Sequence, residues 1–249
     1  MDHAAGIAYY FSQRMFLDNA PGHLYVPEIL VDPARRLLRL WADIDGNEPP
    51  ANIHPVRAGE DVVLRRDLVV RPFEVNHPCR KRGRITVPAL GFAAIDVRQK
   101  LRQEYQNLTG PQLVELKNRG VEITRRVEIP LVAYCGDSAS GDYLDLDFVR
   151  NSKILLLECT FVEPDHLERA RAGGHLHVSD LPALIPRLNN ERILLIHLSR
   201  RTPLATARAL VRATLGPDYD TRVSFFMEHR PKRRRAAEDE NGLPRPPLA

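Results

Sequence analysis

The sequence predicts an α/β layered fold in which several strands end in acidic or histidine side chains. From Val121 onward, short apolar runs alternate with helix-forming stretches, a rhythm typical of a sheet with helices between its strands. Three apolar runs lead into Asp137, Glu158 and His197. Carboxylates and imidazoles brought to one edge of a sheet are suitable metal ligands. A lone histidine after an apolar run is usually packed or capped, so the prediction depends on several such ends in succession.

The first half of the chain is predicted to contain two helices and several strands. Asp2 is placed as the N-cap of the first helix, which presents Ile7, Tyr10, Phe11 and Phe16 at helical spacing. The predicted elements are a helix over 4–16, a strand over 23–26, a helix over 33–44, a loop over 45–60, strands over 62–65 and 68–75, and an extended stretch over 85–96.

The second half is predicted to alternate strands and helices. Residues 97–107 and 110–119 are rich in Lys, Arg, Gln and Glu and are predicted as two helices, the second ending at Gly120. Strands are predicted over 121–124, 129–135, 153–158, 192–196 and 222–226, and helices over 144–150, 163–172, 179–188 and 203–214. Residues 1–230 are predicted to form one domain. Residues 231–249 combine basic and acidic runs with prolines and are predicted to be disordered.

Composition is that of a soluble globular protein, with 27% charged and 43% hydrophobic residues among 249. No apolar stretch reaches the roughly 18 residues of a membrane span, and no leader is visible, so a cytoplasmic protein is expected. Cys79, Cys135 and Cys159 lack C-x-x-C spacing, which favours reduced thiols. The net charge is +4, with basic clusters over 80–84 and 232–235. Such clusters can contact a polyanion. The alternative is a solvated surface for 80–84 and a disordered tail for 232–235, and for the tail we favour this alternative.

Four motifs in a fixed order resemble a known family. They are Gly136-Asp137-Ser138, Leu157-Glu158-Cys159-Thr160-Phe161, Gly174-His175-Leu176-His177 and His197-Leu198-Ser199-Arg200. Their order is similar to that of the tRNase Z branch of the metallo-β-lactamase superfamily, which usually has GDT, HEAT or ECTF, GHS or GHT, and HxSxR. The resemblance covers about residues 70–201. Each motif alone is weak, and the four together are fairly specific.

The resemblance also accounts for the first residues. Asp2 and His3 match the final pair of the superfamily signature His-x-His-x-Asp-His, whose two leading histidines are absent from this chain. The resemblance implies a metallo-β-lactamase αββα sandwich that lacks its first strands. It implies two zinc ions in the full-length family and as few as one here. The implied metal ligands are Asp2, His3, His77, Asp137 and His197.

The implied activity is hydrolysis of a phosphodiester near the 3′ end of precursor tRNA. The resemblance makes Glu158 and His175 a proton-transfer pair and counts Asp2 with them in the catalytic set. An alternative keeps the fold but changes the substrate to a small phosphodiester, sulfate ester or lactone, because the family's long Gly- and Pro-rich RNA-binding arm is not visible. A third alternative is an inactive remnant that binds one metal or a partner chain. We further expect that Met1 is an internal methionine of a longer gene, and the resemblance implies a homodimer.

Overall fold

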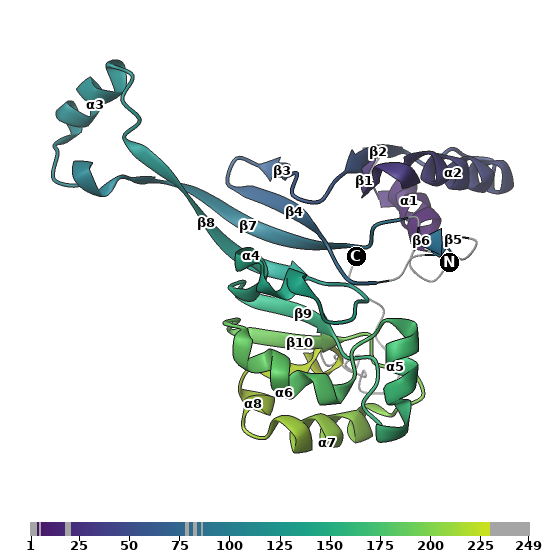
Figure 1. Ribbon diagram of the computed structural model, residues 1–249. Helices are drawn as coiled ribbons and strands as arrows, with labels where there is room; N and C mark the ends of the chain where they lie inside the picture. Colours follow the sequence, from purple (N-terminus) through teal and green to yellow (C-terminus); the bar gives the residue numbers. More distant parts are fainter. Residues whose placement is uncertain are drawn as a thin grey trace, which may run out of the picture.

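The computed structural model describes residues 4, 6–17, 21–77, 80–81, 84–85 and 87–229. Its centre is a seven-stranded mixed sheet with the order β11-β10-β9-β8-β7-β4-β3 (Figure 1). The strands are β3 (Val62–Arg65), β4 (Leu68–Glu74), β7 (Leu90–Leu101), β8 (Thr124–Tyr134), β9 (Ile154–Glu158), β10 (Arg192–Ile196) and β11 (Val223–Phe225). Strands β8 to β11 run parallel, whereas β3, β4 and β7 pair antiparallel, as do β7 and β8.

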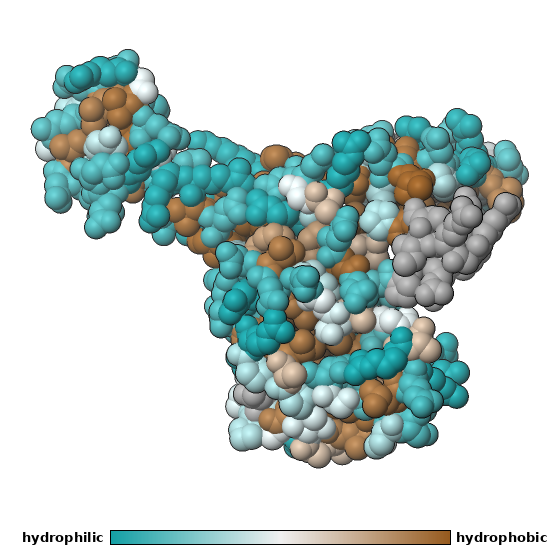
Figure 2. Space-filling view, in the orientation of Figure 1, coloured by the Kyte–Doolittle hydropathy of each residue, from teal (hydrophilic) through white to brown (hydrophobic). Residues whose placement is uncertain are grey.

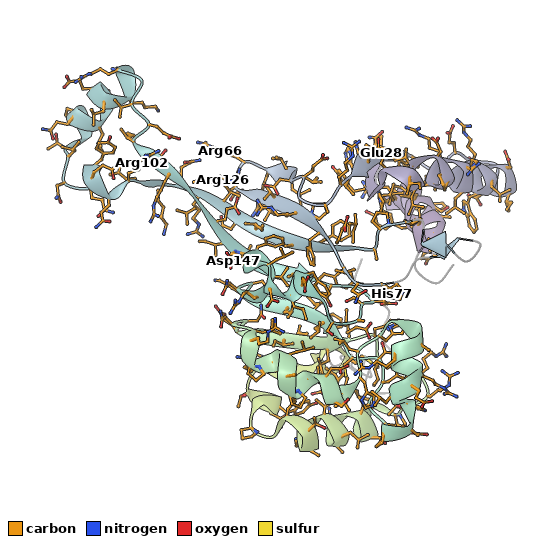
Figure 3. All side chains as sticks on the ribbon, viewed as in Figure 1. Glu28, Arg66, His77, Arg102, Arg126 and Asp147 are labelled. Atoms are coloured by element: carbon orange, nitrogen blue, oxygen red, sulfur yellow. The ribbon has the colours of Figure 1, made fainter. Side chains whose placement is uncertain are left out.

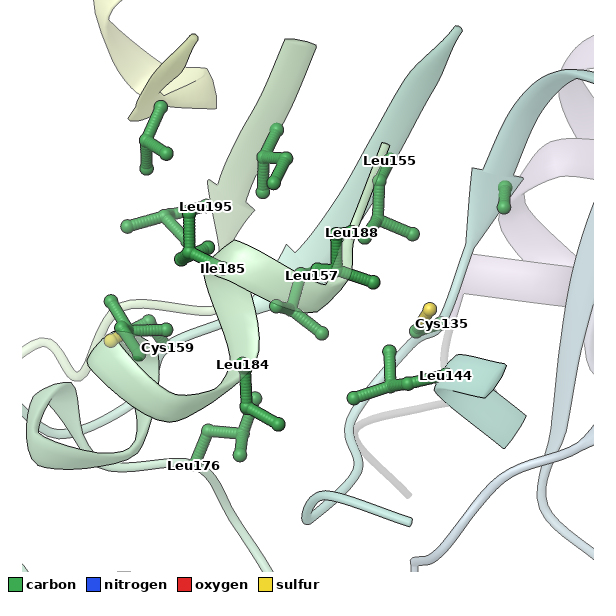
Figure 4. Packing of buried hydrophobic residues seen from close by; sticks show 14 of the residues in the cluster. Cys135, Leu144, Leu155, Leu157, Cys159, Leu176, Leu184, Ile185, Leu188 and Leu195 are labelled. Atoms are coloured by element: carbon green, nitrogen blue, oxygen red, sulfur yellow. The ribbon is translucent and has the colours of Figure 1, made fainter. Parts of the chain in front are cut away.

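Helices cover one face of the parallel half of the sheet. They are α4 (Asp147–Arg150), α5 (Leu167–Gly173), α6 (Leu181–Leu184), α7 (Leu204–Leu215) and α8 (Asp218–Thr221). Alternate residues of β9 and β10, including Leu155, Leu157 and Leu195, are fully buried against Ile185 and its neighbours (Figure 4). This period-two burial explains why the sequence predicts these strands correctly.

The first part of the chain forms a separate layer beside the main sheet (Figure 1). Strands β1 (Gly22–Pro27) and β2 (Ala51–Val56) pair in parallel and lie next to α1 (Gly6–Leu17) and α2 (Val31–Asp45). Phe11 is 1% exposed, and Trp41 Nε1 donates to Ser12 Oγ at 2.8 Å, which joins the two helices. Tyr9 and Phe16 on the outer side of α1 are 65% and 82% exposed.

A long antiparallel hairpin of β7 and β8 projects from the body (Figure 1). The pairing continues to Leu101 opposite Thr124, and α3 (Gly110–Asn118) lies at the end of the projection. Thr109 caps this helix in a reciprocal capping box with Gln112. In Figure 2 most of the projecting surface is hydrophilic.

An ionic network lies at the base of this hairpin. Arg71 on β4 donates to Asp61 at 2.7 and 2.9 Å and to Glu128 on β8 at 3.0 and 3.1 Å. Arg126 contacts the same two carboxylates at 3.1 and 2.8 Å. The Arg71 guanidinium also lies 5.3 Å from the centre of the Phe148 ring. These contacts link β4, β8 and α4 across the intervening strand β7.

Three predictions from the sequence are wrong. Residues 97–107 are not a helix, because 97–101 continue β7 and a short 3-10 turn follows. The strands predicted over 121–124 and 129–135 are one strand, β8, and the predicted loop over 45–60 contains β2. The outer hairpin has solvent on both faces, so its sequence lacks the apolar alternation that marks a half-buried strand. Lysine, arginine and glutamine at such positions favour a helix prediction.

The remaining predicted helices and strands are confirmed within a few residues at each boundary. Several short helices, such as the one predicted over 179–188, are broken into α-helical and 3-10 turns. In the described part of the chain, no helix has the length and apolar character needed to cross a bilayer. The predicted disordered tail over 231–249 lies outside the described residues.

Candidate active site

Three adjacent parallel strands deliver polar residues to one edge of the sheet. β8 ends at Tyr134, β9 at Glu158 and β10 at Ile196, and their pairing registers bring these ends side by side. Asp137 and His197 follow the first and third of these strands. The structure therefore brings these strand ends together, as the sequence predicts.

The turns after these strands have unusual backbone conformations. Gly136 has φ +61°, which glycine adopts without a steric penalty. His197 has φ +58°, a left-handed conformation that costs energy for a residue with a Cβ. A strained backbone persists only where surrounding contacts hold it, and such positions concentrate at functional sites.

His77 reaches the same edge from the end of β4 (Figure 3). The preceding residue, Asn76, bridges to Ala139, whose N–H donates to the Asn76 carbonyl at 2.9 Å. The Asn76 side chain donates to the Ser140 carbonyl at 3.0 Å. Two bonds therefore tie the segment that carries His77 to the loop that carries Asp137.

Three imidazole rings form a row at this edge. The ring centres of His77 and His175 lie 5.3 Å apart, and those of His175 and His197 also lie 5.3 Å apart. Gly173 allows this arrangement, because a Cβ there would lie 2.8 Å from the His175 ring. The structure thus brings together the described residues of the predicted site, His77, Asp137, Glu158, His175 and His197. Asp2 and His3 lie outside the described residues.

Glu158 is fully buried and surrounded by hydrogen-bond donors. Its Oε1 accepts from the Ser138 N–H at 2.6 Å and from His175 Nδ1 at 2.8 Å. Its Oε2 accepts from the Thr160 hydroxyl at 2.5 Å, the Thr160 N–H at 3.3 Å and the Leu176 N–H at 3.2 Å. A carboxylate is an acceptor-only group, so these donors satisfy both oxygens. Glu158 therefore orients His175, whose Nε2 is turned away from the carboxylate.

Asp137 and His197 form a different kind of pair. His197 Nε2 lies 3.0 Å from Asp137 Oδ2, while His197 Nδ1 lies 2.8 Å from the Thr160 hydroxyl. Because that hydroxyl gives its proton to Glu158, Nδ1 must carry the proton it shares with Thr160. In a neutral imidazole this leaves two acceptor atoms facing each other, an arrangement that requires a cation or a second proton between them.

This donor set fits a divalent metal ion. Zinc bonds to nitrogen and carboxylate oxygen at about 2.0–2.2 Å, so atoms 3.0 Å apart can both contact one ion. The donor atoms of Glu158, His175 and His197 also lie within 4.8 Å of one another. That second grouping fits less well, because both Glu158 oxygens and His175 Nδ1 are already engaged in hydrogen bonds.

Other reactive side chains near the site have structural roles. Cys135 and Cys159 are fully buried, and burial raises the pKa of both thiols, so they stay protonated and do not act as thiolate ligands. His177 contacts Ser179 Oγ at 2.8 Å and the Glu163 carbonyl at 3.0 Å and caps a short 3-10 turn.

Sequence reasoning assigned no role to Thr160, Ser138 or Tyr143. Ser138 Oγ lies 2.8 Å from the Tyr143 hydroxyl, which donates to the Ala139 carbonyl at 3.1 Å and so holds the loop that carries Asp137. A signal for Thr160 was available, because residues i and i+2 of extended backbone point to the same side and Thr160 follows Glu158 by two.

Comparisons with known proteins place this arrangement in a family. No family model matches the chain. The chain is 31% identical over 215 residues to the chloroplastic tRNase Z TRZ2 of Arabidopsis thaliana, covering 85% of this chain and 58% of the relative. It is 30% identical over 227 residues to tRNase Z TRZ1 of the same plant, covering 90% and 78%. The chain thus spans less than two thirds of the length of TRZ2.

Structural comparison agrees on the fold. The metallo-β-lactamase fold protein YhfI from Bacillus subtilis superposes with a TM-score of 0.56 and 13% identity, over 90% of this chain and 70% of that one. At this identity the match shows the fold alone, and it confirms the predicted fold class. With the sequence similarity to TRZ1 over most of both proteins, the conclusion is that the chain belongs to the tRNase Z family of the metallo-β-lactamase fold.

Proposed function

We propose that this protein is a metal-dependent phosphodiester hydrolase that acts near the 3′ end of precursor tRNA. The observation that carries the proposal is the pairing of His197 Nε2 with Asp137 Oδ2 at 3.0 Å, beside the buried Glu158–His175 pair. One half of this site offers acceptors for a cation, and the other half holds a proton donor. Hydrolysis of a phosphodiester needs both.

His77, Asp137 and His197 would hold the metal, and Asp2 and His3 are proposed as further ligands. Two imidazoles and a carboxylate are typical zinc ligands, so we propose zinc. When bound, the ion would act as a Lewis acid that activates water and offsets negative charge on a phosphate. The Thr160 hydroxyl fixes the orientation of the His197 ring, as outer contacts do for metal-binding histidines.

His175 is proposed to protonate the departing oxygen. In the reaction water releases a proton to the solvent as its oxygen bonds to phosphorus, the bond from phosphorus to the leaving oxygen breaks, and that oxygen takes a proton from His175 Nε2. Glu158, through its 2.8 Å bond to Nδ1, aims the ring and stabilises the charged imidazole before the transfer. The side chain of His175 is 17% exposed, so a bound substrate can reach it.

The projecting hairpin supports RNA over a small ester as the substrate. Lys100 on β7 lies directly opposite Arg125 on β8, a pairing of like charges that disfavours the hairpin on its own. Arg125 also lines a polar hollow of about 350 Å³ near the end of the hairpin, together with Glu104 and with Arg102, which donates to Glu122. Figure 3 labels Arg102. Cations arranged in this way favour phosphate contacts, since binding a polyanion releases its counterions.

Two further features are part of the proposal. A cytoplasmic location is proposed, although one relative is named as chloroplastic. A homodimer is proposed from the family resemblance, and light scattering of the purified chain measures it directly.

The proposed function is tested with two substrates and one substitution. Purified protein is incubated with zinc and either precursor tRNA or bis-p-nitrophenyl phosphate. We expect cleavage of both, and Asp137→Ala should reduce both rates by more than about 100-fold, since even outer contacts to metal ligands cost about 10–100-fold. Asp145→Ala, which alters an exposed carboxylate paired with Arg187, serves as the control.

Each result has a defined meaning. Cleavage of the small ester without cleavage of precursor tRNA would favour the small-substrate alternative. Wild-type protein that cleaves neither substrate, or an Asp137→Ala variant with unchanged rates, would contradict the proposal.

A further inference from the structure

Thr160 occupies the contact point between the two halves of the site. It is 5% exposed, and its hydroxyl oxygen lies 2.5 Å from Glu158 Oε2, 2.8 Å from His197 Nδ1 and 3.4 Å from His175 Nδ1. Its backbone is fixed as well, because its carbonyl accepts from the Ser199 N–H at 2.9 Å. A single buried hydroxyl therefore contacts both the proton-transfer pair and the histidine beside Asp137.

The direction of these hydrogen bonds follows from the number of protons. A hydroxyl has one proton, and a carboxylate can only accept, so Thr160 donates to Glu158. Thr160 must then accept from His197, which places a proton on His197 Nδ1. The Nε2 lone pair is left facing Asp137 Oδ2 at 3.0 Å. Four other donors hold the Glu158 carboxylate in place, so this direction cannot easily reverse.

We propose that Thr160 is a positioning residue that sets the tautomer of His197, so that the Nε2 lone pair is presented to a cation at Asp137. This inference rests on the proposed metal site and adds the residue that prepares it. Without the hydroxyl, the imidazole can carry its proton on either nitrogen and can rotate at its left-handed backbone position. Outer contacts of this kind typically contribute about 10–100-fold to metal affinity.

Two substitutions separate the hydroxyl from the volume of the side chain. Thr160→Val removes the hydroxyl and keeps the branched shape, whereas Thr160→Ser keeps the hydroxyl and removes a methyl group. Circular dichroism and thermal melting of the full chain check that each variant folds. If Thr160→Val does not fold, Thr160→Ala compared with Thr160→Ser makes the same distinction.

The first readout is the tautomer of His197 in metal-free protein. Nitrogen-15 spectra of the imidazole rings are recorded at about pH 8.5, where an ordinary imidazole is neutral. The His197 signals are assigned by their loss in His197→Gln. We expect His197 Nδ1 to carry a proton in the wild type and in Thr160→Ser, whether or not Nε2 shares a second proton with Asp137. In Thr160→Val we expect the form protonated on Nε2 alone to appear.

The second readout is zinc affinity, measured by competition with a chromophoric chelator. We expect Thr160→Val to bind zinc about 10–100-fold more weakly than the wild type, and Thr160→Ser to stay within about threefold. A Thr160→Val variant with unchanged tautomer and unchanged affinity would overturn the inference, as would Thr160→Ser behaving like Thr160→Val. The tautomer measurement needs neither zinc nor RNA. Failure to cleave precursor tRNA would therefore refute the proposed function without refuting the role of Thr160.

Discussion

The two ends of strand β8 lie in opposite environments. At its carboxyl end, Ala133 is fully buried between neighbouring strands, and the chain continues into the loop of Asp137. At its amino end, Arg125 projects from a two-stranded ribbon with solvent on both faces (Figure 1). One strand therefore connects a buried site, where packing fixes each side-chain contact, to an exposed surface whose side chains are mainly charged.

This contrast predicts different responses to substitution. At the buried end, both Glu158 oxygens and the Thr160 hydroxyl have defined partners, so a change of one atom alters the chemistry. At the exposed end, the folded state depends little on any one side chain, and substitutions there should alter affinity for a polyanion. The ionic network around Arg71 lies between the two and should affect stability.

The largest expected effect is at the buried end. His175→Ala should lower the rates on precursor tRNA and on bis-p-nitrophenyl phosphate by about 10²–10⁴-fold, the usual contribution of general acid catalysis. The reduction should be smaller for the p-nitrophenyl ester, whose leaving oxygen needs less protonation. His54→Ala, which changes a histidine on β2, is the matched control. Equal rates in wild type and His175→Ala would show that the Glu158–His175 pair is structural.

A smaller effect is expected at the exposed end. Replacing both Lys100 and Arg125 with serine should raise the KM for precursor tRNA about tenfold and make its dependence on the logarithm of salt concentration less steep by about 1–2. Thermal stability should be unchanged or slightly higher, because the facing like charges are removed. Steady-state kinetics at several salt concentrations measure both quantities.

The matched control for the hairpin replaces Arg36 and Arg39, two exposed arginines of α2, with serine. An equal loss of RNA affinity in the control would mean that net charge, and not the hairpin, governs binding. Hydrolysis of the small ester should be the same in both double variants.

The smallest effect on activity, but a clear effect on stability, is expected from Arg71→Ala. The variant leaves Asp61 and Glu128, whose side chains are 21% and 31% exposed, without the Arg71 guanidinium, at a cost of about 2–3 kcal/mol in the free energy of unfolding. Urea denaturation measures this difference. Arg65→Ala, which alters an exposed ion pair, should change stability by less than about 0.5 kcal/mol.

The same network predicts a dependence of stability on pH. Hydrogen bonds from Arg71 lower the pKa of Asp61 below its ordinary 3.8 and the pKa of Glu128 below its ordinary 4.5. Carboxyls with lowered pKa values stabilise the fold above their ordinary pKa, and this stabilisation is lost as the pH falls through the lowered values. The wild type should therefore lose stability below about pH 4.5 more steeply than Arg71→Ala. Parallel curves for the two proteins would contradict this.

The sequence predicts the buried half of the molecule well because burial leaves a pattern. The strands ending at Glu158 and Ile196 alternate buried and less buried residues, and the side chains after each strand meet as expected. The grouping of Asp137, Glu158 and His197 was therefore predictable from the apolar runs that precede them. The inclusion of His77 and the individual roles rest on the family resemblance. Hydrogen-bond partners such as Thr160 and Ser138 were not predicted, because local sequence does not determine which buried atoms meet.

The projecting hairpin was not predictable by the same reasoning. Residues 97–107 have the composition of an exposed helix, but pairing with residues 124–128 makes 97–101 part of a strand. Tertiary pairing here overrides local propensity. The sequence shows no Gly- and Pro-rich insertion of the kind that marks the family's arm, and the β7–β8 hairpin projects without one.

The central claim is that His197 holds a metal ion while His175, whose ring is stacked 5.3 Å away, does not. The most direct test is the zinc content of His197→Ala and His175→Ala after equal loading and dialysis, measured by elemental analysis beside the wild type. The account predicts that His197→Ala loses most of its zinc and that His175→Ala keeps the wild-type amount. Loss of zinc from His175→Ala, or full retention by His197→Ala, would contradict it.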